Sequence, residues 1–306
     1  MIAQRTEGAS PWSDLAVLLA WTLACTFIIQ LVVLVLGALL GADLTALVNP
    51  DTSGGSRIFD YAVLASGSIG TFLIPAYIFQ RIRPSFTVFP STQWTDWKAY
   101  LFGLGILLSF GPCMSLLSDW NMQMTLPESM KGIERWMRAQ EDSMARITEN
   151  VVMVSDWNRL ILNILVIGVL PAISEELFFR GALQQIFARA FKSEHLAVWV
   201  VAILFSAIHF QFYGFLPRFL LGLFFGYVVL WTRNIWIAVF AHFVNNTSVV
   251  VLAFYYASQN KSYSELMKSD SYPIFMYIGS LLLSMGMAYL FYQYAVKKRF
   301  YGKRLG

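Results

Sequence analysis

The sequence predicts an all-α protein, a polytopic transmembrane helical bundle of about eight spanning helices plus one interfacial amphipathic helix. Of its 306 residues, 57% are hydrophobic and only 13% are charged, whereas soluble domains carry about 25% charged residues. Residues 15–42, 61–79 and 99–118 contain no charge, and each run approaches or exceeds the roughly 20 apolar residues that a helix needs to cross hydrocarbon. Backbone polar groups in lipid must be satisfied within the segment, which selects helices over open strands.

Eight segments have the length and apolar character of membrane spans. Each is bounded by charged or turn-forming residues, and the whole chain, residues 1–306, is expected to form a single integral membrane domain. The expected spans are residues 15–41, 61–80, 99–117, 159–190, 196–213, 216–232, 235–257 and 272–296.

The distribution of lysine and arginine predicts the orientation. The strongest basic cluster lies within residues 297–304, and basic residues favour the cytoplasmic side. An even number of spans puts both ends on that side, so both termini are expected in the cytoplasm. The short loops suit a bacterial cytoplasmic membrane. The formal net charge of +4 places basic side chains near lipid head groups, and no signature of nucleic-acid binding is present.

The connection between the third and fourth spans, residues 119–158, has a helical pattern of its own. A capping box is expected at residues 125–128, with a proline in the first turn. Charged residues fill one face of the segment, so a helix lying flat on the outer membrane surface is expected. Its apolar stripe consists of Met130, Ile133, Trp136, Met137, Met144, Ile147 and Val151.

Three ionisable residues interrupt the fourth span. A charge at the centre of a membrane helix costs about 2.5–3.5 kcal/mol on insertion scales, so Glu175, Glu176 and Arg180 require a reason. Arg180 follows Glu176 by four residues, and the two are expected to pair on one helix face. A structural ion pair explains Glu176 and Arg180. It does not explain Glu175, whose side chain points about 100° away round the helix. Glu175 is therefore a candidate general base.

Two histidines fall within later spans. His209 lies in the fifth and His242 in the seventh, and Asn246 follows His242 by four residues on the same helical face. A single histidine in a membrane span is commonly a hydrogen-bonded packing residue. Two of them, together with two glutamates and an arginine, predict one polar pocket where three helices meet.

These residues resemble the signatures of the CAAX protease and bacteriocin-processing (CPBP) family of intramembrane proteases. The three motifs are Glu175-Glu176-x-x-x-Arg180, Phe205-x-x-x-His209 and His242-x-x-x-Asn246, all within residues 155–260. The resemblance implies that Glu175, helped by His209, activates water. It also implies that His242 and Asn246 stabilise the oxyanion, and that Glu176 and Arg180 orient the site.

The same resemblance leaves the cofactor and the substrate open. Family members have been described as metalloproteases, and zinc could be held by Glu175, His209 and His242; a metal-free glutamate mechanism needs no cofactor and is preferred. The expected partners are membrane-embedded or lipid-anchored substrates, which include prenylated proteins or peptide precursors, and the lipid bilayer itself.

Two other classes of function fit the composition. A non-catalytic scaffold or immunity protein would keep the same polar site for binding. A proton-coupled transporter would also place ionisable groups near the membrane midplane. Transporters commonly show matching broken helices in two halves, which this sequence lacks. A protease is therefore the preferred hypothesis.

Overall fold

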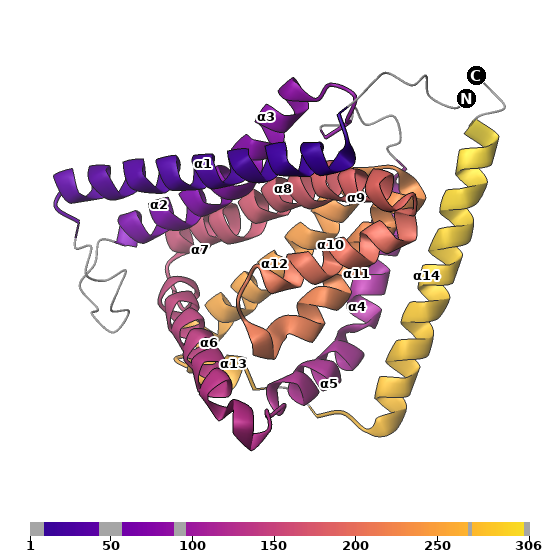
Figure 1. Cartoon of the computed structure of the whole chain (residues 1–306). Helices are drawn as coiled ribbons and strands as arrows, with labels where there is room; N and C mark the ends of the chain where they lie inside the picture. The colour runs from indigo at the N-terminus through magenta and orange to yellow at the C-terminus, as the bar shows by residue number, and fades with distance from the viewer. Residues whose placement is uncertain (1–8, 43–56, 89–95, 269–270, 303–306) are drawn as a thin grey trace.

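The computed structural model describes residues 9–42, 57–88, 96–268 and 271–302, and every regular element among them is helical (Figure 1). This confirms the predicted all-α class. Six helices are long and apolar enough to cross a membrane. They are Pro11–Leu39, Ile58–Ile82, Trp157–Phe191, Phe212–Thr232, Ile235–Ser258 and Ile274–Lys297.

The number of spans differs from the expected eight at two places. The expected third span is two helices, α4 (Trp97–Ser109) and α5 (Gly111–Met122), which are bent by 48° and make a seventh span if counted together. Pro112 near the start of α5 lacks the N–H that would continue the first helix. The expected fifth span is α10 (Glu194–Ala207), only 14 residues long. At 1.5 Å per residue it covers about 21 Å, less than a bilayer core.

The expected fourth span is one continuous helical rod, which carries both candidate glutamates. It runs through α7 (Trp157–Asn163), a π-helical stretch at Ile164–Val169, α8 (Leu170–Glu176), a second π-helical stretch at Leu177–Leu183, and α9 (Gln184–Phe191). π-Helical insertions in α-helices occur frequently at functional sites. Here the second insertion follows directly after the glutamate pair.

Two small residues let α10 and α11 (Phe215–Thr232) approach closely. A Cβ added at Gly222 would lie 3.1 Å from the Cα of Ala202, and one at Gly226 would lie 2.8 Å from Val198 Cγ1. In membranes such small-residue seams provide much of the helix association. The carbonyls of the same two glycines accept hydrogen bonds from Arg180 and Gln184 of the rod that carries Glu176.

The N-terminal helices cover one side of this rod. α1 (Pro11–Leu39) packs against α2 (Arg57–Ser68), α3 (Ile74–Ile82) and α9, and lies above the rod in Figure 1. Asp14 of α1 binds Arg83 just beyond α3 at 2.6 Å. The main apolar core, which includes Leu18, Phe79 and Phe179, lies at this junction.

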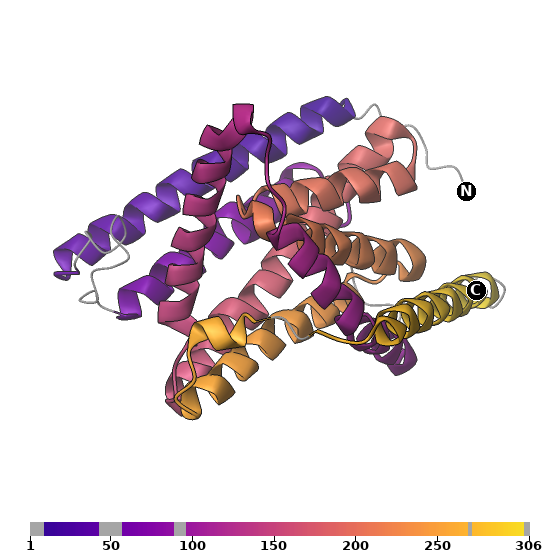
Figure 2. The ribbon, with the colours of Figure 1, turned by 90° about the horizontal axis from the view of Figure 1, so that it is seen from below.

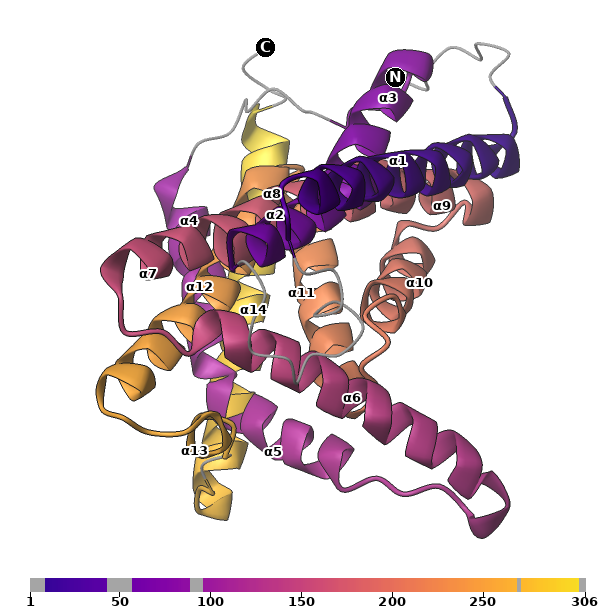
Figure 3. The same ribbon diagram turned by 90° about the vertical axis from the view of Figure 1, so that its left-hand side faces the viewer.

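The predicted amphipathic helix is present as α6 (Lys131–Val152) and crosses the ends of several other helices (Figure 3). The predicted capping box is wrong, because a short 3₁₀ turn, Glu128–Met130, precedes α6 and its first residues have no side-chain cap. Glu134 takes over that role. It accepts hydrogen bonds from Leu126 N and Lys131 Nζ, both at 3.0 Å, and these contacts lower its pKa to about 2.

The C-terminal α14 (Ile274–Gly302) lies at the edge of the bundle against α4 and α5 (Figure 2). Phe102 stacks on Phe291 with ring centres 5.5 Å apart. Ser280 Oγ donates to the Ser109 carbonyl at 2.7 Å, close to the bend between α4 and α5. Residues 303 and 304 of the basic cluster that predicts orientation lie outside the described residues.

Candidate active site

The two adjacent glutamates occupy different environments at the end of α8. Glu176 is completely buried, and Glu175 retains 8% of its surface. Glu176 Oε1 accepts hydrogen bonds from Arg180 Nη1 and from His242 Nδ1, each at 3.0 Å. The predicted pairing of Glu176 with Arg180 is present, and Glu176 also holds the imidazole of His242.

Arg180 is fixed on several sides at once. Its Nη2 donates to the Gly222 carbonyl at 3.0 Å. Its guanidinium lies 4.7 Å from the centre of the Phe205 ring and 5.5 Å from that of Phe225. Aromatic faces attract a desolvated cation. The charge of Arg180 is thus compensated by a carboxylate, a carbonyl and two rings rather than by water.

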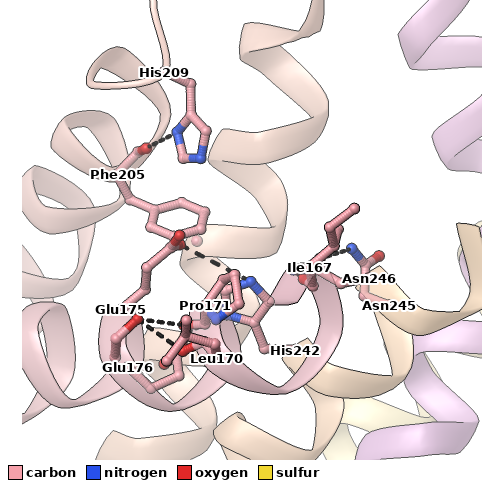
Figure 4. Close-up of polar contacts among 12 residues, drawn as sticks. Ile167, Leu170, Pro171, Glu175, Glu176, Phe205, His209, His242, Asn245 and Asn246 are labelled. Atoms are coloured by element: carbon pink, nitrogen blue, oxygen red, sulfur yellow. Dashed lines mark hydrogen bonds and ion pairs between the residues drawn. The ribbon is translucent and has the colours of Figure 1, made fainter. Parts of the chain in front are cut away.

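His242 of α12 (Ile235–Ser258) is buried beside both glutamates. Its ring stacks on Phe225 at 5.0 Å, with 16° between the planes. Because the Glu176 carboxylate accepts hydrogen bonds, Nδ1 of His242 is the donor in that contact. Nε2 is the other ring nitrogen, and it faces Glu175 Oε2 at 4.0 Å (Figure 4).

His209 is not placed where the sequence predicts it. It lies in a turn after α10 ends at Ala207, and not inside a helix. The helix stops because Phe210 adopts a left-handed φ of 52°. His209 Nδ1 donates to the Phe205 carbonyl at 2.8 Å. The Phe205 ring contacts both imidazoles, at 5.4 Å from His209 and 5.9 Å from His242, and lies between His209 and Glu175 in Figure 4.

Asn246 has a backbone partner that the motif does not reveal. Its Nδ2 donates to the carbonyl of Ile167 at 3.1 Å. Pro171 stands four residues after Ile167 and has no N–H to offer that carbonyl. The asparagine therefore satisfies a polar group that a proline left free inside the membrane helix. Asn245 Nδ2 in turn donates to Asn246 Oδ1 at 3.1 Å.

The histidine tautomers would suit a metal, because each uses Nδ1–H on a carboxylate or carbonyl and leaves Nε2 free. The positions do not form a three-ligand site. Over the described ranges, no group of three histidine, cysteine, aspartate or glutamate side chains is arranged to hold a metal ion. The alternative zinc set of Glu175, His209 and His242 is not assembled in this conformation.

Several residues that shape the site are absent from the predicted set. Phe225 and Gly222 of α11 hold His242 and Arg180, and Pro171 creates the need for Asn246. The spacing of Gly222 and Gly226, four residues apart, is a sequence signal for close helix packing that points to α11. Which carbonyl each side chain meets depends on the tertiary structure.

Together, the buried Glu–His–Arg cluster and the apolar helices define an integral membrane protein with a polar site inside the bundle. Residues 157–248 match the family of type II CAAX prenyl endopeptidase Rce1-like proteins. This match agrees with the resemblance of the three motifs to the CPBP family of intramembrane CAAX-type proteases. All six candidate residues fall within the match.

A curated relative is similar over part of this region. The uncharacterized protein YpbD of Bacillus subtilis (strain 168) is 29% identical over 90 residues, which are 28% of this chain and 43% of the relative. The chain thus spans less than half the length of that relative. No solved structure matches the chain significantly.

Proposed function

We propose that the chain is a membrane-embedded endopeptidase in which Glu175 activates water against peptide bonds of membrane-associated substrates. The observation that carries this proposal is the gap of 4.0 Å between Glu175 Oε2 and His242 Nε2. Both atoms are acceptors when the carboxylate is ionised and the imidazole is neutral. A water molecule placed between them donates one proton to each, with its oxygen lone pairs left for attack.

The chemistry then needs only groups already in place. Glu175 removes one proton from the water as the oxygen bonds to the carbonyl carbon of the peptide. The same proton passes to the amide nitrogen as the C–N bond breaks, which leaves a carboxylic acid and an amine. Glu176 holds His242 Nδ1 at 3.0 Å and so fixes the direction of Nε2. Atoms and protons balance without an oxidant or a cofactor.

The geometry favours a different division of work between the histidines from the one that the resemblance implies. His242 lies beside Glu175, whereas His209 lies beyond the Phe205 ring. We assign the support of Glu175 to His242. Asn246 has a second amide proton besides the one on the Ile167 carbonyl, and this proton is our candidate for the oxyanion.

The substrates we propose are membrane-embedded or lipid-anchored proteins and peptides, with prenylated chains as one class that the family name suggests. The site lies between apolar helices, so a substrate has to enter from the bilayer or from its surface. We also propose a bacterial cytoplasmic membrane with cytoplasmic termini, which rests on the basic cluster near the C-terminus.

The direct test uses the purified chain in liposomes with a panel of membrane-anchored peptides, each in prenylated and unprenylated form. Mass spectrometry identifies products, and the variants are Glu175→Gln and His242→Gln, with the exposed Glu128→Gln as control. We expect cleavage by the natural chain and the control only, since removal of a general base costs about 10²-fold or more.

Treatment with a strong chelator separates the two cofactor hypotheses. In the metal-free mechanism turnover persists after exhaustive chelation. Loss of turnover that zinc restores would contradict that mechanism. Cleavage that persists in the Glu175→Gln variant would contradict the hypothesis that Glu175 is the general base.

A further inference from the structure

An apolar pocket lies among five helices, α4, α5, α11, α12 and α14. We call it the α5–α14 pocket. Its volume is about 580 Å³, within the roughly 300–1,000 Å³ of small-molecule sites in proteins. It lies beside the bend between α4 and α5, where Phe110 and Gly111 form part of its lining. α4 packs against α12 and α14, whereas α5 packs against α11 and α14.

The mouth of this pocket is continuous with the lipid-facing surface of the bundle. Its most exposed lining residues are Leu108 at 66%, Leu281 at 41% and Met285 at 61%. Leu282 and Leu283, which follow on α14, are also exposed, and α14 is one of the candidate membrane spans. The pocket therefore opens sideways toward the hydrocarbon of the bilayer.

The floor of the pocket backs onto the candidate active site. Leu221 and Phe224 line the pocket and pack against the core cluster that contains Phe225. The rings of Phe224 and Phe225 have centres 5.6 Å apart, and Phe225 stacks on His242 at 5.0 Å. Two aromatic rings thus separate the pocket from the buried histidine.

The lining favours a ligand without charge or hydrogen-bonding groups. Among the described residues that form it, none is charged and none is a histidine. Ser248 Oγ donates to the Asn245 carbonyl at 2.7 Å, and Ser284 Oγ donates to the Leu281 carbonyl at 2.9 Å. The Asn245 amide donates to Asn246. These polar side chains are engaged within their own helices, and apolar cavities in proteins stay dry and take up apolar molecules.

The size of the pocket selects a single hydrocarbon chain over a partner helix. A spanning helix is about 30 Å long and 10–12 Å wide, which far exceeds this space. We propose that the α5–α14 pocket holds one acyl chain of a bilayer phospholipid, which enters past Leu108 and Met285 and ends against Phe224. The proposal concerns lipid binding and does not require proteolysis, so it stands or falls separately from the proposed function.

Photolabelling in a membrane tests this proposal. The full chain is reconstituted in phosphatidylcholine nanodiscs, in which a fraction of the lipid carries a diazirine near the end of one acyl chain. After irradiation, mass spectrometry maps the labelled residues. Leu282 and Leu283, which are exposed on α14, provide the reference for contact with bulk lipid. We expect Leu221, Phe224 or Val244 in the pocket lining to be labelled as strongly as this reference.

A matched pair of variants shows whether the label reaches the floor through the pocket. A Cβ at Gly111 in the lining, or at Gly286 on α14 outside the lining, meets nothing within 4 Å. Gly111→Phe should lower labelling of the floor at least about fivefold, since an overfilled cavity cannot also hold the chain. Gly286→Phe should leave the labelling unchanged. Ser118→Phe fills the pocket from further along α5 if Gly111→Phe, beside Pro112, folds poorly.

Four results would overturn the proposal. The first three are an unlabelled floor, floor labelling that the pocket-filling variants do not change, and an equal loss of labelling in Gly286→Phe. The fourth is displacement of the label by a prenylated peptide but not by excess unlabelled phospholipid, which would assign the pocket to the anchor of a substrate.

Discussion

Glu175 and Glu176 are neighbours in the sequence with different surroundings in the fold. Glu176 has no exposed surface and is bonded to Arg180 and His242. Glu175 keeps some exposure and faces His242 Nε2. Helical spacing predicts the pairing of residues 176 and 180 and frees Glu175. The contact of both glutamates with His242 depends on how α12 packs, which spacing alone does not determine.

Removal of Arg180 should be strongly destabilising. Arg180→Leu leaves Glu176 buried without its cation, and breaking a buried ion pair costs about 3–5 kcal/mol. Thermal unfolding in detergent should show a large fall in Tm. The control is Arg189→Leu on the same rod, where the arginine is exposed; a similar loss in both variants would show that Arg180 has no special role.

The bond between Asn246 and Ile167 makes a sharper prediction. Asn246→Leu should cost about 1–3 kcal/mol, because a part-buried carbonyl within a membrane helix loses its donor. Pro171→Ala restores a backbone N–H four residues after Ile167, so the cost should shrink in the double variant. The coupling is measured by the Tm values of the natural chain, the two single variants and the double variant. Purely additive effects of the two substitutions on Tm would contradict it.

At the scale of elements, the most informative difference from the sequence-based expectation is α10. Hydrophobicity extends to residue 213, and the expected span follows it, but the helix ends at Ala207. The cause is the left-handed turn at Phe210. Two residues later, Phe212 accepts a hydrogen bond from Asn121 Nδ2 and contacts the Trp136 ring. A hydropathy pattern contains no information about such tertiary contacts. His209 therefore sits in a turn.

Close packing of the rod against residue 88 predicts the effect of a small change. A Cβ on residue 181 would lie 2.7 Å from the Val88 carbonyl oxygen, so Gly181→Ala should destabilise the fold by about 1–3 kcal/mol. Gly132→Ala in α6, where a Cβ meets nothing within 4 Å, should be neutral or stabilising. Equal Tm shifts would contradict the packing.

The start of α6 should loosen in acid. The pKa of Glu134 is lowered to about 2 by Lys131 and the Leu126 amide. A depressed folded-state pKa stabilises fully above the unfolded value of 4.5, and this contribution is lost as pH falls from there toward 2. Hydrogen exchange over residues 124–138, corrected for intrinsic rates, should show the loss. Glu134→Gln should abolish the pH dependence; a persistent transition would assign it to another group.

For the whole molecule, two features predict the all-α class well. The sequence contains long runs without charge, and in lipid a helix satisfies the hydrogen bonds of its own backbone. Apolar length predicts where each helix lies to within a few residues, apart from the bend at Phe110 and the early end of α10. The candidate site is predicted as a set of residues because ionisable groups are rare in the spans. The geometry within the site cannot be predicted in this way. The π-helical stretches at Ile164–Val169 and Leu177–Leu183 rotate side chains away from ideal α-helical spacing.

The central claim is that Glu175 makes the chain a protease in its own membrane. Quantitative mapping of protein N- and C-termini tests this most directly, in cells that carry either the natural chain or Glu175→Gln at equal expression. We predict that specific new termini of membrane or lipid-anchored proteins disappear in the variant, and those termini identify the substrates. Identical sets of termini, alongside a phenotype that requires the chain, would contradict catalysis and favour a scaffold.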